Sequence, residues 1–142
     1  IKAIEYYQKP GFEALRASRR FDAPMGIAEM MKMTEPVLQI GNMTGEGWFL
    51  TGEMLELLHE GVSNILCLQP FACLPNHVTG KGMIKRLREL HPEANIAPID
   101  YDPGASEVNQ LNRIKLMMSV AFRNAAAKSE VIPFDDEVTA AG

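Results

Sequence analysis

The sequence lacks the features that mark several classes of protein. Its 142 residues hold two cysteines and no Cys-x-x-Cys pair, so it cannot by itself supply the four ligands of a closed zinc site or of an iron–sulfur cluster. No apolar run approaches the ~20 residues that span a bilayer, and the first residues lack the apolar core of a signal peptide. We therefore expect a cytoplasmic protein that does not contact the membrane. Basic residues are not in excess, since 14 lysines and arginines face 18 aspartates and glutamates, and the net charge of −4 argues against nucleic acid as a partner.

What is present is the composition of one ordinary domain. With 46% hydrophobic residues, a chain of this length builds a core without disulfides or a structural metal. It opens at Ile1 without a methionine, from which we expect a piece of a longer protein. Its patterning suggests a helical N-terminal segment over 1–40, an α/β domain over 41–126 and a C-terminal tail over 127–142.

Short apolar runs alternate with helical stretches in the middle of the chain, which is the pattern of an α/β fold. A strand over 64–68, a helix from about Met83 that Pro92 stops, and a strand over 95–99 form a βαβ unit, whose two strands should be parallel. Another helix is predicted to end at Gly61. The fold expected is thus a small open parallel sheet of two or three strands with flanking helices.

The remaining elements are predicted less directly. Residues 1–22 indicate two short helices broken at Pro10 and Gly11. Val37 to Ile40 fits either a third strand or the end of a helix from Ile27, and we favour the helix. The last helix is predicted to run from Ser106 to about Ala126 and to bury one apolar face, made of Val108, Leu111, Ile114, Met118, Ala121 and Ala125.

Polar residues follow both predicted strands, in the segments QPFACLPNH and DYDPGASE. Because the carboxyl ends of parallel strands meet at one edge of a sheet, where ligands bind in open α/β folds, we expect these segments to lie together. The candidate residues at this edge are Cys73, His77, Asp100, Tyr101 and Asp102, with Glu46 nearby if the loop GNMTGEG reaches the same edge.

Cys73 is the most interesting of these candidates. It lies between Pro70 and Pro75, a rigid setting for a thiolate ligand or nucleophile, although an isolated cysteine is often a small apolar residue that fills a loop. His77 is either a second ligand or a hydrogen-bonded loop residue, and Cys67 belongs to the core. Asp102 begins a tight turn, and we expect Asp100 and Asp102, at the strand end, to point to opposite sides.

The segment Thr79-Gly80-Lys81-Gly82 is not a P-loop, because that motif needs an earlier glycine and a following serine or threonine. Helix N-termini at Gly80 and Ser106 can nevertheless attract a phosphate or carboxylate. Candidate residues for binding such an anion are Gly80, Lys81, Ser106 and Arg113, with Asn109 on the polar face of the last helix.

Three ordered motifs carry a resemblance to a known family: GEGWFLTGEM at 45–54, LQPFACLPNHVTGKGM at 68–83 and IDYDPGASEVNQLNRIKLMMS at 99–119. They resemble the large acyl-CoA dehydratase activase-related proteins, which are related to the activator and components of (R)-2-hydroxyglutaryl-CoA dehydratase. The similarity covers roughly residues 41–120.

The resemblance implies a C-terminal fragment of a long protein that supports ATP-dependent, one-electron reduction of a dehydratase through four-iron four-sulfur clusters. The ATPase region is absent from this chain. Cys73 matches the cysteine of the family motif QPFGCLPNH, which makes it a candidate cluster ligand, while Ala72 replaces the motif glycine. Glu46, His77 and Asp102 match motif positions without an assigned role.

The partners implied are other domains of the parent chain and an acyl-CoA dehydratase, with an acyl-CoA thioester as a further ligand. We expect the fragment alone to be inactive. Two alternatives stay open, a docking module of the same protein that binds no metal and a domain that binds a coenzyme A phosphate.

Overall fold

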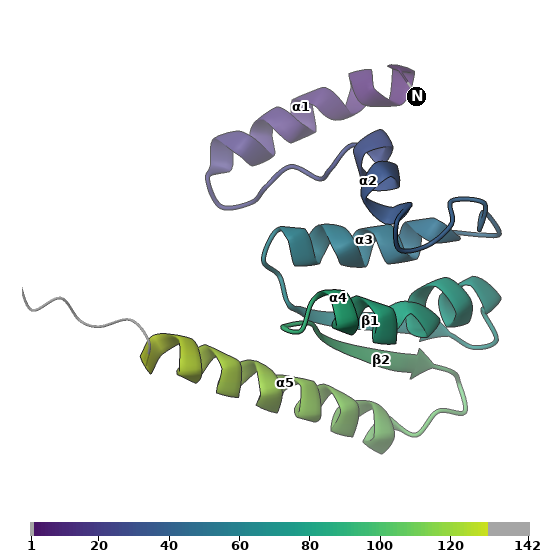
Figure 1. Ribbon diagram of the computed structural model, residues 1–142, viewed down its shortest axis with the longest axis vertical. Coiled ribbons are helices and arrows are strands. Elements are labelled where there is room, and N and C mark those ends of the chain that lie inside the picture. The colour runs from purple at the N-terminus through teal and green to yellow at the C-terminus, as the bar shows by residue number, and fades with distance from the viewer. Residues whose placement is uncertain (1, 131–142) are drawn as a thin grey trace, which may run out of the picture.

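The computed structural model describes residues 2–130, as five α-helices and two β-strands (Figure 1). Three helices come first, and two further helices alternate with the strands. The elements are α1 (Lys2–Ser18), α2 (Ile27–Thr34), α3 (Trp48–His59), β1 (Asn64–Pro70), α4 (Ile84–Leu90), β2 (Asn95–Tyr101) and α5 (Glu107–Glu130). A π-helical turn, η1 (Asn76–Gly80), and a 3-10 turn, η2 (Lys81–Met83), lie between β1 and α4.

The two strands are parallel and pair in register from Asn64 opposite Asn95 to Pro70 opposite Tyr101. With α4 as the crossover helix they form the predicted βαβ unit, so the α/β fold is confirmed. Each strand extends two residues beyond its predicted end. Within residues 2–130 there is no third strand, since the sheet is two-stranded.

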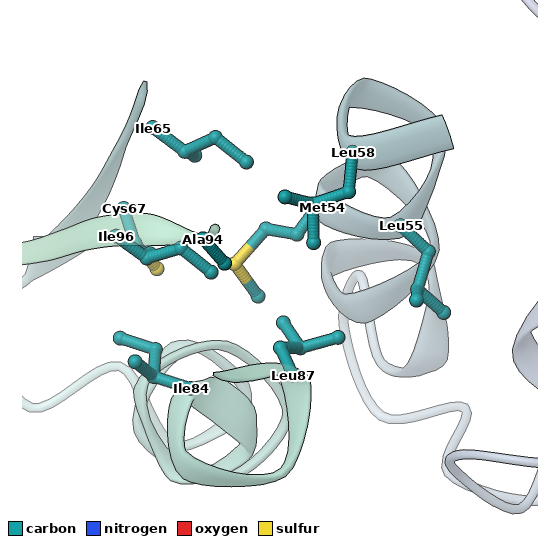
Figure 2. Close-up of a cluster of buried hydrophobic side chains, with 9 residues drawn as sticks. All are labelled: Met54, Leu55, Leu58, Ile65, Cys67, Ile84, Leu87, Ala94 and Ile96. Carbon is teal, nitrogen blue, oxygen red and sulfur yellow. The ribbon is translucent and has the colours of Figure 1, made fainter. Parts of the chain in front are cut away.

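The core lies between one face of the sheet and helices α3 and α4 (Figure 2). Burial alternates along β1, with Ile65, Cys67 and Gln69 inside and Leu66 and Leu68 outside, as the period of a strand requires. Met54, Leu55, Leu58, Ile84, Leu87, Ala94 and Ile96 complete the cluster. Helix α2 packs onto α3 where Met30 and Thr34 approach Gly52.

Helix α5 covers the opposite face of the sheet, above β2. The side chain of Asn95 donates a hydrogen bond to the carbonyl of Met117 at 2.9 Å, and Ile99 is fully buried beneath the helix. As a result, β1 is covered on its inner face and β2 on both faces.

The free edge of β2 is closed by side chains. Arg88 donates to the carbonyl of Ile96 at 2.6 Å, Arg113 to that of Pro98 at 2.9 Å, and Gln110 to that of Asp100 at 2.8 Å. Pro98 also removes a backbone donor from this edge. Such devices prevent a further strand from pairing with β2.

Three sequence expectations about the helices are wrong in detail. Residues 2–18 form one helix that continues through Pro10 and Gly11, because α1 is exposed on nearly all sides and water can hydrate the carbonyl that proline leaves unpaired. The helix from Ile27 ends at Thr34, and residues 35–40 turn instead, since Pro36 has no N–H with which to continue it.

The apolar face of α5 is also displaced from the predicted one. Met117, 8% exposed, is the buried methionine, while Met118 and Leu111 are on the surface. The helix continues to Glu130, and positions 131–142 of the predicted tail lie outside the described residues. None of the helices in residues 2–130 has the length and apolar character needed to cross a membrane.

Candidate functional site

The three motif segments meet at the carboxyl end of the sheet. The N–H of Phe71 donates to the carbonyl of Tyr101 at 3.1 Å, which ties the loop after β1 to the end of β2. The loop before α3 reaches the same place, because residues 42, 44 and 47 line a hollow together with Leu74 and Pro75. The structure therefore brings together the segments that the topology predicts to be neighbours.

Two glycines of the loop before α3 make this approach possible. Gly45 has a φ of 60°, and a Cβ atom there would lie 2.9 Å from the Pro75 ring. Gly47 has a φ of 56°, and a Cβ atom would lie 2.0 Å from the carbonyl oxygen of Asn42. Neither position accepts another side chain without a local shift.

Cys73 is half-buried in the loop between β1 and η1, and its backbone is fixed on both sides. Its N–H donates to the carbonyl of Pro70 at 3.2 Å, and its carbonyl accepts from the N–H of His77 at 3.1 Å. The side-chain amide of Asn76 donates to the Cys73 sulfur at 3.0 Å, and Asn76 is itself buried. The sulfur is thus held by a buried donor.

The other cysteine has a different environment. Cys67 is buried in β1 as part of the core, as the sequence suggests, and its sulfur accepts from the Gln69 amide at 3.2 Å. Burial raises the pKa of the Cys67 thiol, while the Gln69 hydrogen bond and the Lys81 charge oppose the change. A protonated, enclosed thiol of this kind is a structural residue.

A groove of about 390 Å³ lies beside the Cys73 loop. Four of the predicted residues line it, namely His77, Lys81, Asp100 and Asp102, together with Gln69, Pro70, Phe71, Ala72 and Ala105. The Lys81 ammonium lies 3.5 Å from the Asp100 carboxylate, with both side chains partly exposed. The charges inside the groove are therefore already partly compensated.

Asp102 performs the turn-forming role that the sequence indicates. Its carboxylate accepts from the N–H of Gly104 at 3.0 Å and its carbonyl from the N–H of Ala105 at 2.8 Å. Asp100 and Asp102 line the same groove, so the expectation that they point to opposite sides is wrong. Residues two apart along a strand share a face, and Asp102 directly follows the end of β2.

The residues proposed for a coenzyme A phosphate are spread over the molecule. Gly80 is buried next to Cys67 and Gln69. The next α-helix in the sequence, α4, has only seven residues. Arg113 lines a separate hollow on the far side of β2 and is bonded there to Pro98, whereas Lys81 lines the groove. Ser106 and Asn109 are exposed at the start of α5, where the Ser106 carbonyl accepts from the N–H of Asn109 at 3.0 Å.

Glu46 lies exposed in the loop before α3. Partial burial of the neighbouring Glu53 carboxyl raises the pKa of Glu53, and the charges of Glu56 and Glu46 raise it further. Glu46 is thus part of an acidic region on α3 and the loop before it.

Sequence reasoning missed two residues of the site. Gln69 is fully buried, and its side-chain oxygen has no hydrogen-bond partner among the described residues. The other is Asn76, which lies three residues after Cys73, a spacing that brings side chains together on a helical turn.

A complete metal site is not built by these residues. Within residues 2–130, no three His, Cys, Asp or Glu side chains form a group that could hold a metal ion. Cys73 fits the role of one sulfur ligand, but the other ligands of a cluster would have to come from elsewhere.

The fold and this site define an α/β domain with a cysteine-bearing loop at the carboxyl end of a two-stranded parallel sheet. In comparisons with protein-family models, curated proteins and solved structures, nothing matches the chain.

Proposed function

We propose that the chain is the C-terminal domain of a large protein related to the 2-hydroxyacyl-CoA dehydratase activators, and that Cys73 gives one thiolate ligand to a shared iron–sulfur cluster. The observation that carries the proposal is the buried Asn76 amide that donates to the Cys73 sulfur at 3.0 Å. Hydrogen bonds to ligating sulfurs stabilise their charge and adjust the reduction potential of a cluster. When bound, such a cluster supplies one-electron transfer.

The surroundings of Cys73 support a cluster at an interface with another domain or with a dehydratase. Three large apolar side chains of the same loop and turn are mostly exposed, namely Phe71, Leu74 and Val78. Burying them against a partner would exclude water from the sulfur ligand and release free energy through the hydrophobic effect. The remaining ligands would come from that partner.

The same apolar side chains favour a second candidate, a docking module that binds a partner without metal. In that case Cys73 would be a loop residue whose sulfur accepts one hydrogen bond. Coenzyme A binding has no comparable support, since Lys81 and Arg113 lie at different hollows.

The test compares two cysteine variants of the anaerobically purified full-length parent protein. Iron and acid-labile sulfide per chain are measured for the wild type, for Cys73→Ala and for Cys67→Ala. The cluster proposal predicts that Cys73→Ala loses about one cluster's worth of iron and sulfide, because ligation depends on the thiolate. Cys67→Ala is the matched control and keeps both, since its thiol is enclosed in the core.

Iron that is unchanged in Cys73→Ala would exclude the ligand role. Measured binding of the protein to a dehydratase would then support the docking module. For that purpose Leu74→Asp is the informative variant, because it alters the exposed apolar surface and leaves the thiol in place.

A further inference from the structure

Gln69 is a buried residue whose hydrogen bonding is incomplete. Its side chain is fully buried, and within residues 2–130 the side-chain oxygen has no hydrogen-bond partner. The amide nitrogen is satisfied, because it donates to the Cys67 sulfur at 3.2 Å and lies next to Gly80. A buried acceptor in this state destabilises the fold, so native proteins keep few of them. The oxygen therefore points to a donor that comes from outside these residues.

This oxygen faces the groove at the carboxyl end of the sheet. Gln69 lines the groove, and its amide nitrogen is turned toward Cys67, so the oxygen is on the groove side of the planar amide. Gln69 and Asp100 are register partners on the parallel strands, so their side chains leave the same face of the sheet. Because Gln69 is fully buried and the Asp100 side chain is 42% exposed, Gln69 forms the floor of the groove and Asp100 its rim.

The groove holds charges of both signs. The Lys81 ammonium lies 3.5 Å from the Asp100 carboxylate, farther than the roughly 2.7–2.9 Å of a strong charged hydrogen bond, so both groups can take a further partner. Asp102 adds a second carboxylate, and His77 adds an N–H donor. The carboxylates would repel a ligand that is only negative, and Lys81 would repel one that is only positive. A ligand with one charge of each sign matches the groove best.

We propose that this groove binds the zwitterionic head of an amino acid. The ligand's ammonium donates to the Gln69 oxygen and to the Asp100 carboxylate, since an ammonium carries three hydrogens and is compact enough to reach the floor. The ligand's carboxylate accepts from Lys81 and His77. Both ends of the head thus find partners, and the unsatisfied acceptor of Gln69 receives its donor.

The rest of the groove fits an apolar side chain on this amino acid. Its other walls are apolar, and Phe71, 71% exposed, offers a ring face for contact. The volume of about 390 Å³ lies within the range of small-molecule sites, about 300–1,000 Å³. Cys73 is not among the described residues that line the groove, so this proposal goes beyond the cluster proposal and does not depend on it.

The experiment titrates the chain with three ligands that share one carbon skeleton. L-Phenylalanine carries both charges, phenethylamine only the ammonium, and 3-phenylpropionate only the carboxylate. Calorimetry measures each dissociation constant, and nuclear magnetic resonance follows the side-chain amide signal of Gln69. Phenylalanine should bind at least about ten times more tightly than either analogue and shift the Gln69 signal, because each analogue lacks one charged hydrogen-bonding group.

Four variants separate the two ends of the ligand. Lys81→Gln should weaken phenylalanine about tenfold without weakening phenethylamine, and Asp100→Asn should weaken both of these ligands without weakening 3-phenylpropionate. Gln69→Leu removes the acceptor at the floor and should also weaken phenylalanine about tenfold, with thermal melting as the check on its fold. Lys85→Gln, the same charge change at an exposed position on α4, is the matched control and should bind like the wild type.

Three results would overturn the proposal. With millimolar phenylalanine, the absence of both heat and a shift in the Gln69 signal would mean that water alone completes Gln69. Equal affinity for phenylalanine and either analogue would exclude recognition of a zwitterion. Unchanged affinity in both Lys81→Gln and Gln69→Leu would place the ligand elsewhere. The chain is titrated without iron, so each result is independent of the iron content that tests Cys73.

Discussion

The backbone at Ala72 is held in a left-handed conformation, with a φ of 53°, immediately before Cys73. A residue with a Cβ atom loses about 1 kcal/mol in this conformation, whereas glycine adopts it freely. We predict that Ala72→Gly raises the free energy of unfolding by up to about 1 kcal/mol, measured by urea denaturation. Ala105→Gly, in the turn after β2 where no positive φ is found, is the control and should not stabilise the fold.

The effect of Glu53 on the stability of the folded chain should depend on pH. Its pKa is raised above the ordinary value of 4.5 in the folded chain, so the native state favours its protonated form and loses stability as the pH rises through the folded pKa. Glu53→Gln should therefore raise both the free energy of unfolding and the melting temperature at pH 7. The gain in free energy is about 0.5 kcal/mol or less, because the carboxylate is largely screened by solvent.

The benefit of Glu53→Gln should disappear well below pH 4.5, where the wild-type carboxyl is protonated in both states. Glu29→Gln on α2 removes the same charge at an exposed position and serves as the control. Equal gains at both pH values would contradict the assigned cause.

The contact between α2 and α3 depends on Gly52. A Cβ atom there would lie 2.9 Å from the Met30 side chain and from the Thr34 hydroxyl, and both residues are buried. We predict that Gly52→Ala lowers the free energy of unfolding by about 1–3 kcal/mol because it forces the helices apart. Gly11→Ala in α1, with open space around the new methyl group, should instead increase helix content in circular dichroism. A neutral Gly52→Ala would mean that the helices adjust freely.

The sequence predicts an element well where its own pattern determines burial. The alternation in β1, Gly61 after α3 and Pro92 after α4 locate their elements to within a few residues. It predicts poorly where tertiary contacts decide. Which methionine of α5 faces the sheet depends on how the helix lies on β2, and a helix as exposed as α1 tolerates Pro10 because water replaces the lost bond.

At the candidate site, too, some features can be predicted from the sequence and others depend on tertiary contacts. Parallel strands bring their carboxyl ends together whatever the side chains are, so the gathering of His77, Lys81, Asp100 and Asp102 at one groove follows from topology. The donor to the Cys73 sulfur does not follow from topology, because η1 is a π-helical turn that orients Asn76, and the sequence indicates only a loop there.

In the whole molecule, a surface available for contacts lies at the carboxyl end of the sheet. There the Cys73 loop exposes Phe71 and Leu74 beside the groove.

The iron content of Cys73→Ala relative to Cys67→Ala, measured side by side in the anaerobically isolated full-length protein, tests the proposed role of the loop most directly. The buried Asn76 donor and the fixed backbone of Cys73 predict that Cys73→Ala loses one cluster while Cys67→Ala retains it. Equal iron and sulfide in the two variants would contradict a ligand role for Cys73.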